Sequence, residues 1–136
     1  KNRHVQKETP FKYSFVIKEN YLSVTVSGHF YLSDAKKMYT DALETLMDKK
    51  LSKLFFNVCK VQGIVSFIDR FYLGEFAALE SLNYMGKGLS RIAVSMYGEE
   101  PIIDPERFGE IVARNRGLNI KVTTDKKEAF QFLGVK

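Results

Sequence analysis

The 136-residue sequence contains a single cysteine, two histidines and no tryptophan. One cysteine, Cys59, excludes an internal disulfide, so an apolar core has to hold the fold, and this cysteine usage favours a reducing compartment such as the cytoplasm. The histidines, His4 and His29, stand in no Cys/His cluster with metal-ligand spacing. We therefore expect a cytoplasmic protein that binds no metal ion and no other cofactor.

Long apolar runs are also absent, because no segment approaches the roughly 20 residues that a membrane-spanning helix needs. The first ten residues, KNRHVQKETP, are polar throughout, unlike a signal peptide. The sequence therefore predicts no insertion into a membrane.

The familiar sequence signatures of catalysis are missing too. The chain has no G-x-S-x-G elbow, no P-loop and no G-x-G-x-x-G fingerprint. A nucleophilic Cys59 would need a histidine base, and His29 is the one candidate within residues 13–136. Because Cys59 ends a compact apolar run, an inert core thiol is the better interpretation. We predict no catalytic residues and a protein that is not an enzyme.

What the sequence has in excess is positive charge, with a formal net charge of +5. Of this, +3 falls within residues 1–12, where four basic residues stand against Glu8. A nucleic-acid-binding domain concentrates its charge on one folded face and interleaves aromatic residues with it. The distribution here instead predicts a flexible basic tail over residues 1–12 and no nucleic-acid partner.

Five segments have the apolar patterns of strands. The first two alternate in hydrophobicity around a Glu19–Asn20 turn, and the next two are compact runs typical of strands buried on both faces. The last alternates more cleanly, which indicates a strand nearer the edge of the sheet. These segments are residues 13–17, 22–26, 53–58, 91–96 and 119–124.

Four segments have helical periodicity, and each starts at a residue that suits an N-cap: Ser33, Ser66, Asp104 and Asp125. They cover residues 33–50, 66–86, 104–117 and 125–134. In the second, bulky apolar residues repeat at steps of three and four, at Ile68, Tyr72, Phe76, Leu79 and Leu82.

The order of elements is therefore β-β-α-β-α-β-α-β-α. Helical crossovers make the strands that they join parallel, and the hairpin adds one antiparallel strand at an edge. We expect an α/β fold with a single mixed, mostly parallel β-sheet of about five strands and packed helices, formed by one domain over residues 13–136.

The start of the second predicted helix, SFIDRFYLGEF, resembles a motif of STAS domains, the fold of anti-sigma-factor antagonists and of the cytoplasmic tails of sulfate transporters. In that family a buried strand ending in Asp is followed by a loop and a motif like FIDSSG. Phe67, Ile68 and Asp69 match as they stand. Arg70 replaces the phosphorylatable Ser, and Asn57 replaces the Asp near the strand end, so the resemblance does not extend to the phosphorylation switch.

The C-terminal segment ARNRGLNIKVTTDKKEAFQFLG is similar to the corresponding part of small stand-alone bacterial proteins described as SpoIIAA-like. That subgroup resembles both STAS domains and the CRAL-TRIO lipid-binding fold. The resemblance covers Tyr13 to Leu133 and implies a SpoIIAA-like fold.

Two functions are compatible with these features. The first is a non-enzymatic, STAS-like regulatory module that binds a protein partner or a second copy of itself, as a homodimer would. Its expected contact residues are Asp69, Arg70, Phe71 and Tyr72, with Asn115 and Arg116 as weaker candidates. The alternative is a binder of a small apolar or lipid-like ligand in a CRAL-TRIO-like pocket, which the eleven Phe and seven Tyr could line.

The two charges in the motif have different expected roles. Ser66 and Asp69 have the spacing of a capping box, in which the Asp69 carboxylate reaches back to the Ser66 N–H. Arg70 opposes the helix dipole in the first turn, so we expect it to face solvent and contact an acidic group of a partner. A surface ion pair with Asp69 or Glu75 is the simpler alternative.

Overall fold

The computed structural model describes residues 9–136. Residues 1–8 of the expected basic tail lie outside the described residues. Close to the boundary, the Thr9 carbonyl accepts a hydrogen bond from the His29 N–H at 2.8 Å, and the first strand already begins at Lys12.

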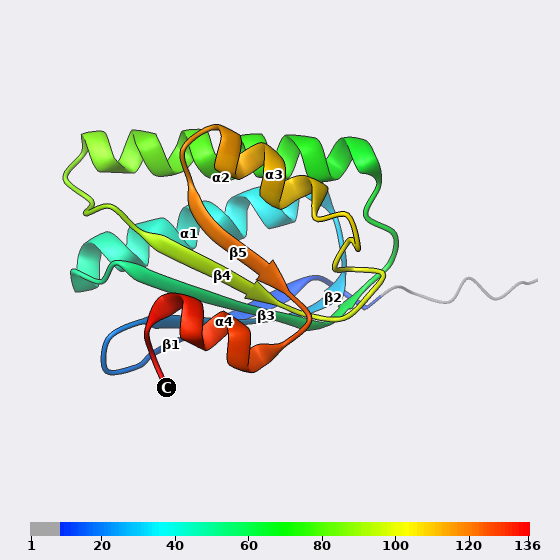
Figure 1. The fold of residues 1–136 in the computed structure, drawn as a ribbon, viewed down its shortest axis with the longest axis horizontal. Helices are drawn as coiled ribbons and strands as arrows, with labels where there is room; N and C mark the ends of the chain where they lie inside the picture. Colours follow the sequence, from blue (N-terminus) through cyan, green and yellow to red (C-terminus); the bar gives the residue numbers. More distant parts are fainter. Residues whose placement is uncertain (1–8) are drawn as a thin grey trace, which may run out of the picture.

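The centre of the fold is one five-stranded sheet whose strand order follows the chain (Figure 1). The first strand is antiparallel to the second, and all other neighbours are parallel. This confirms the predicted mixed sheet with its antiparallel strand at an edge and the last strand at the other edge. The strands are β1 (Lys12–Ile17), β2 (Leu22–His29), β3 (Lys53–Gln62), β4 (Ala93–Tyr97) and β5 (Asn119–Thr123).

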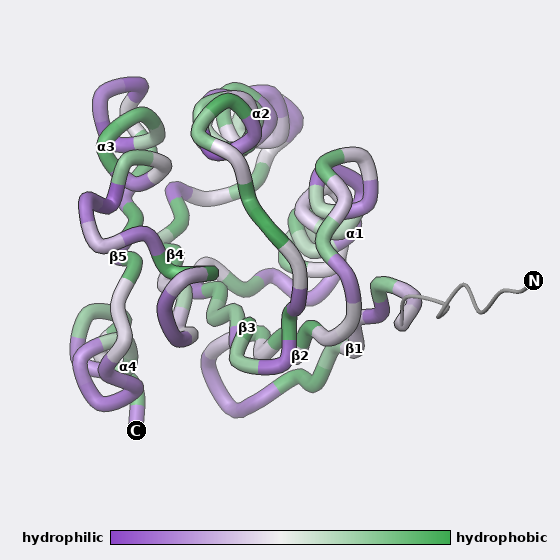
Figure 2. Tube along the Cα trace, turned by 90° about the vertical axis from the view of Figure 1, so that its right-hand side faces the viewer, coloured by the Kyte–Doolittle hydropathy of each residue, from purple (hydrophilic) through white to green (hydrophobic). Residues whose placement is uncertain are grey.

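The four helices are divided unequally between the two faces of the sheet, as Figure 2 shows. α1 (Leu32–Lys49), α2 (Phe67–Gly86) and α3 (Phe108–Asn115) lie on one face, and α4 (Lys126–Leu133) lies alone on the other. Crossovers of one hand that step in one direction across a sheet deliver their helices to the same face. α4 follows the last strand, is not a crossover, and packs against β3, β4 and β5 from the opposite side.

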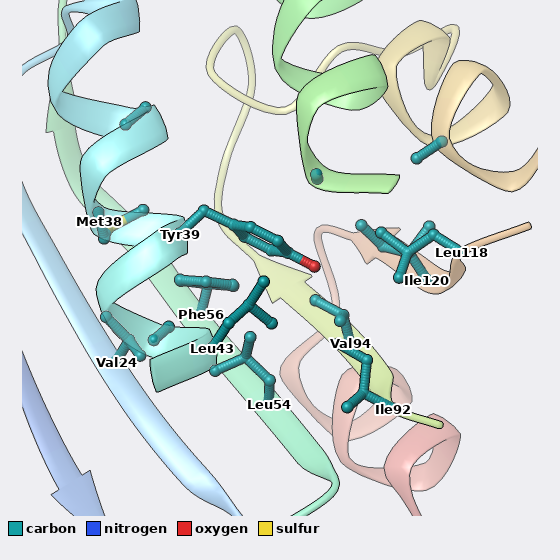
Figure 3. Close-up of a cluster of buried hydrophobic side chains, with 14 of the residues drawn as sticks. Val24, Met38, Tyr39, Leu43, Leu54, Phe56, Ile92, Val94, Leu118 and Ile120 are labelled. Carbon is teal, nitrogen blue, oxygen red and sulfur yellow. The ribbon is translucent and has the colours of Figure 1, made fainter. Parts of the chain in front are cut away.

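The core follows from the alternation of side chains along the strands. On β3, Leu54, Phe56 and Val58 point to the three-helix face, while Phe55 points to α4 and packs against Phe130. Figure 3 shows the larger cluster, with Val24, Phe56, Val94 and Ile120 rising from successive strands toward the helices. The compact apolar run at 53–58 is thus buried on both faces, as predicted.

Two predicted N-caps are confirmed and two are corrected. Ser66 and Asp125 each accept backbone N–H hydrogen bonds at the start of α2 and α4. Ser33 is not the cap of α1, because Tyr31 holds the extended N-cap conformation and Ser33 already lies within the helix. Asp104 does not directly precede α3: Arg107 has a left-handed backbone (φ 55°), which delays the helix to Phe108.

Candidate functional site

The start of α2, where the sequence motif lies, is fixed by a side-chain cap. Ser66 Oγ accepts a hydrogen bond from the Asp69 N–H at 3.1 Å, with Ser66 in extended conformation. In the described part of the chain, the expected return bond from the Ser66 N–H to the Asp69 carboxylate is not present. Asp69 therefore takes part in the cap through its backbone rather than through its carboxylate.

Arg70 is partly buried and its guanidinium bonds within the chain, so the expectation of a free side chain facing solvent is wrong. Its guanidinium donates from Nη1 to the Ile102 carbonyl and from Nη2 to the Pro101 carbonyl, both at 2.8 Å. These carbonyls belong to the connection between β4 and α3, more than 30 residues away in sequence. Within residues 9–136 Arg70 forms no ion pair with Asp69 or Glu75. Its charge is used to hold this connection against α2.

Asp104, in the same connection, forms hydrogen bonds that lead into α3. Its carboxylate accepts hydrogen bonds from the Phe108 N–H at 2.9 Å and the Glu106 N–H at 3.2 Å. The bond from Phe108 is the main reason that the pKa of Asp104 is lowered, and Arg70 and Arg107 add electrostatic stabilisation of the carboxylate. The Asp104 carboxylate thus accepts backbone N–H groups just before and at the first residue of α3.

Phe71, Tyr72 and Arg116, three of the predicted contact residues, do lie together. The Arg116 guanidinium sits 5.4 Å from the centre of the Phe71 ring and 3.4 Å from the Glu75 carboxylate, which joins the end of α3 to α2. Phe71 is half-buried and meets Tyr72 edge to face, while Tyr72 is 46% exposed. Asn115, the last residue of α3, is exposed beside Arg116.

The most exposed apolar side chains near this point were not among the predicted contact residues. Ile64 is 89% exposed, Phe67 65%, Ile68 57% and Ile111 49%. The Phe67 ring stacks on the Phe108 ring at 4.0 Å, so the beginnings of α2 and α3 share one aromatic contact. We call the group formed by Ile64, Phe67, Ile68, Tyr72, Phe108 and Ile111 the α2–α3 surface.

The bulky residues that repeat along α2 were used in the sequence only to predict a helix, and several of them belong to its exposed face. The bulky stripe of α2 correctly indicates a helix, yet Ile68, Tyr72, Leu79 and Leu82 are exposed. The buried face carries Gly74, Ala77, Ala78, Ser81 and Tyr84, most of which are small. Gly74 explains the reversal: a Cβ atom there would lie 2.6 Å from the Gly109 carbonyl oxygen of α3, so bulky residues cannot face inward at this crossing.

Among the described residues, no group of three or more His, Cys, Asp or Glu side chains is placed to hold a metal ion. No helix within residues 9–136 has both the length and the hydropathy to span a membrane.

Comparison with solved structures identifies the architecture. An anti-sigma factor antagonist from Mycobacterium paratuberculosis superimposes with a TM-score of 0.54 at 12% sequence identity, over 92% of this chain and 95% of that one. The chain has the SpoIIAA-like fold. A second structure, an uncharacterized protein from Shewanella loihica PV-4 that is described as having a SpoIIAA-like fold, matches with a TM-score of 0.51 at 15% identity, over 97% of this chain and 99% of that one.

No protein-family model and no curated protein matches the sequence. The likeness therefore concerns the fold, and it confirms the STAS-like, SpoIIAA-like architecture that the FID motif and the C-terminal segment indicated. Within the SpoIIAA-like fold, the position after Asp69 holds Arg70, whose guanidinium is bonded to the connection between β4 and α3.

Proposed function

We propose that the protein is a cytoplasmic, non-enzymatic protein-interaction module that binds a different protein through the α2–α3 surface. The observation that carries the proposal is the exposure of Ile64, Phe67 and Ile68 within the short segment 64–68 that leads into α2, where the Phe67 ring also stacks on Phe108. Apolar side chains exposed singly are ordinary, whereas a contiguous group that includes aromatic residues is typical of protein contact sites.

The geometry supports a preformed site. The Phe67–Phe108 stack holds two of its rings in place, and Arg70 ties the connection that leads into Phe108. A surface fixed in this way loses little side-chain freedom on binding, which favours affinity. Asp69 and Arg116 lie at its border, where charged groups set orientation and association rate more than affinity.

A different protein, rather than a second copy, is supported by the fold comparison. The Mycobacterium paratuberculosis neighbour is an anti-sigma factor antagonist, a name that describes action on another protein. The non-enzymatic part of the proposal rests on the sequence, which carries none of the catalytic signatures considered above.

Site-specific crosslinking in the native host tests the proposal. Phe67→p-benzoylphenylalanine should give one discrete adduct on irradiation, while the same replacement of the exposed Gln131 on α4 should give none. The adduct is identified by mass spectrometry, and the pair is reconstituted from purified proteins. Ile68→Ala should then weaken binding at least ten-fold, and Val16→Ala, which shortens another exposed apolar residue on β1, should not change it.

Equal labelling from positions 67 and 131, or equal affinities for Ile68→Ala and the wild type, would overturn the proposed site. A crosslink from position 67 to another copy of the chain, with a dimer seen by light scattering, would replace the different protein with self-association.

The proposal also excludes a phosphorylation switch at the STAS position. Arg70 cannot accept a phosphoryl group, and Ser66, the nearest serine along the chain, already accepts a hydrogen bond from the Asp69 N–H. Intact-protein mass spectrometry of material from the native host should show no stoichiometric phosphate, and a phosphorylated Ser66 would contradict this statement.

A further inference from the structure

A cavity of about 130 Å³, partly open to solvent, lies between the sheet and the three helices on that face. Its floor is formed by strand side chains such as Phe56 and Val94, and its roof by Leu73 and Ala77 of α2. Figure 3 shows the neighbouring Tyr39, which also lines it, reaching from α1 over the strands. Cores usually contain few voids larger than a water molecule, so a cavity of this size needs an explanation.

The cavity exists because small residues face each other where α2 meets α3. Gly74 and Ala77 on α2, with Gly109 and Ala113 on α3, border it. Their size permits the close helix crossing at Gly74, but it leaves the space beneath the crossing unfilled. The apolar walls around this space lack partner atoms on one side, so an apolar ligand that enters it forms dispersion contacts that the empty protein does not have.

The chemistry of the lining defines the ligand. All charged groups at the cavity already bond to the protein backbone, and two positive charges balance two negative ones. Arg70 and Arg107 donate to main-chain carbonyls, while Asp104 and Glu110 accept main-chain N–H groups. The rest of the lining is almost entirely apolar. Such a site offers no counter-charge to an ionised ligand.

The volume sets the size of the ligand. An engineered apolar cavity of roughly 150 Å³ in another protein takes up benzene, which is close to the present volume. A long acyl chain needs several times this space. The lipid-like part of the alternative ligand expected from the sequence is therefore disfavoured, and the small apolar part is favoured.

We propose that this cavity is a binding site for a neutral, single-ring apolar molecule. The site uses the inner face of α2, whereas the α2–α3 surface uses the outer face, so the inference goes beyond the proposed interaction function and does not depend on it.

The test uses toluene as the probe with the folded wild-type protein. Titration up to the solubility limit of toluene, followed by methyl NMR, should give saturable shifts of Leu73, Ile103 and Ile120, with nuclear Overhauser effects from toluene to the same methyl groups. Dodecanoate, a single-chain fatty acid, should give none at equal concentration. A toluene site that maps to Ile68 and Ile111 instead would place binding on the outer surface and overturn the proposal.

Two variants change the volume in opposite directions. Ala77→Val partly fills the cavity and should weaken toluene binding at least ten-fold, while Met96→Ala enlarges it and should strengthen naphthalene binding at least ten-fold. Ile68→Ala, on the outer face, should leave toluene binding unchanged, which separates this test from that of the interaction surface. Absence of saturable toluene shifts in the wild type, or tighter binding of dodecanoate than of toluene, would refute the site even if a variant fails to fold.

Discussion

The two halves of α2 are held in place in different ways. In the first half the backbones of α2 and α3 come close together, with Gly74 against Gly109. Arg70 also bonds this half to carbonyls of the connection between β4 and α3. The second half faces α1, and hydrogen bonds between side chains join the two helices. Ser81 bonds Tyr39 at 2.7 Å, and Tyr84 bonds Glu44 at 2.8 Å.

The difference shows what each half requires of the sequence. A backbone-level crossing requires the absence of a side chain, so substitution there can only add unwanted volume. A bridge between side chains requires a particular hydroxyl and its partner, so it can be removed without steric conflict. The first half bears the α2–α3 surface and is held by the close helix crossing and by the hydrogen bonds of Arg70. Substitutions in the two halves should therefore have different effects on stability.

The largest effect is expected at the crossing. Gly74→Ala places a Cβ atom 2.6 Å from the Gly109 oxygen, so α2 and α3 must separate, at a cost of about 2–3 kcal/mol of unfolding free energy. Gly86→Ala, at the other end of the helix, meets no atom within 4 Å and should change stability by less than about 0.5 kcal/mol. Urea unfolding of both variants measures this, and equal losses would show that the crossing is not tight.

The next effect concerns Arg70. Arg70→Ala removes two charge-assisted hydrogen bonds and should lower the unfolding free energy by about 1.5–2 kcal/mol. Amide hydrogen exchange should become faster within residues 99–107 and stay unchanged at the end of α2. Asp69→Ala should cost less than about 0.5 kcal/mol, because only its backbone joins the cap. The opposite ranking would restore the role of Arg70 as a free surface residue.

A smaller effect is expected from the bridge to α1. Tyr39→Phe deletes a buried hydroxyl that bonds Ser81 and should cost about 1 kcal/mol by thermal or urea unfolding. Ser81 keeps its bond to the Ala77 carbonyl, so no new unsatisfied group is created. A loss as large as that of Gly74→Ala would mean that the bridge, rather than the crossing, fixes the helix.

The smallest effect at neutral pH, and the most specific, involves Tyr84. Burial, reinforced by the Glu44 carboxylate, raises the pKa of Tyr84 from 10.0 to about 12. A pKa that is higher in the folded than in the unfolded state gives stability that is complete below pH 10 and lost as the pH rises to 12. At pH 7 Tyr84→Phe loses only the bond to the exposed Glu44 carboxylate and should cost about 0.5 kcal/mol. Between pH 10 and 12 the wild type should lose unfolding free energy faster than Tyr84→Phe, and parallel pH profiles would contradict this.

Much of this arrangement could be predicted from local patterns. The order of strands and helices, the antiparallel edge strand and the caps at Ser66 and Asp125 depend on residues within a few positions of each other. Periodicity also identified α2 as a helix. It did not identify the buried face of α2. One side of the helix carries bulky apolar residues and another carries small residues, and both sets repeat at the helical period. The close approach of α3 decides which side is buried, and the sequence of α2 alone does not encode that approach.

The role of Arg70 was hidden for a similar reason. Its partners are main-chain carbonyls, which every residue has, so no residue type at positions 101 and 102 marks them. One weaker candidate from the sequence, Arg116, does have partners that are identifiable side chains. It was named from the sequence only as a weaker contact candidate, yet the structure brings it to Phe71 and to the Glu75 carboxylate.

The strand order of the sheet has a consequence for how the chain reaches this fold. The spatial order β1-β2-β3-β4-β5 is also the order of synthesis. When each strand is synthesised, the strand that it pairs with has therefore already been synthesised. The hairpin of β1 and β2 can form first, and each later strand with its crossover extends the edge by one position. No strand has to be inserted between two others, so the parallel sheet, usually slow because its contacts are distant in sequence, can grow from one side as the chain leaves the ribosome.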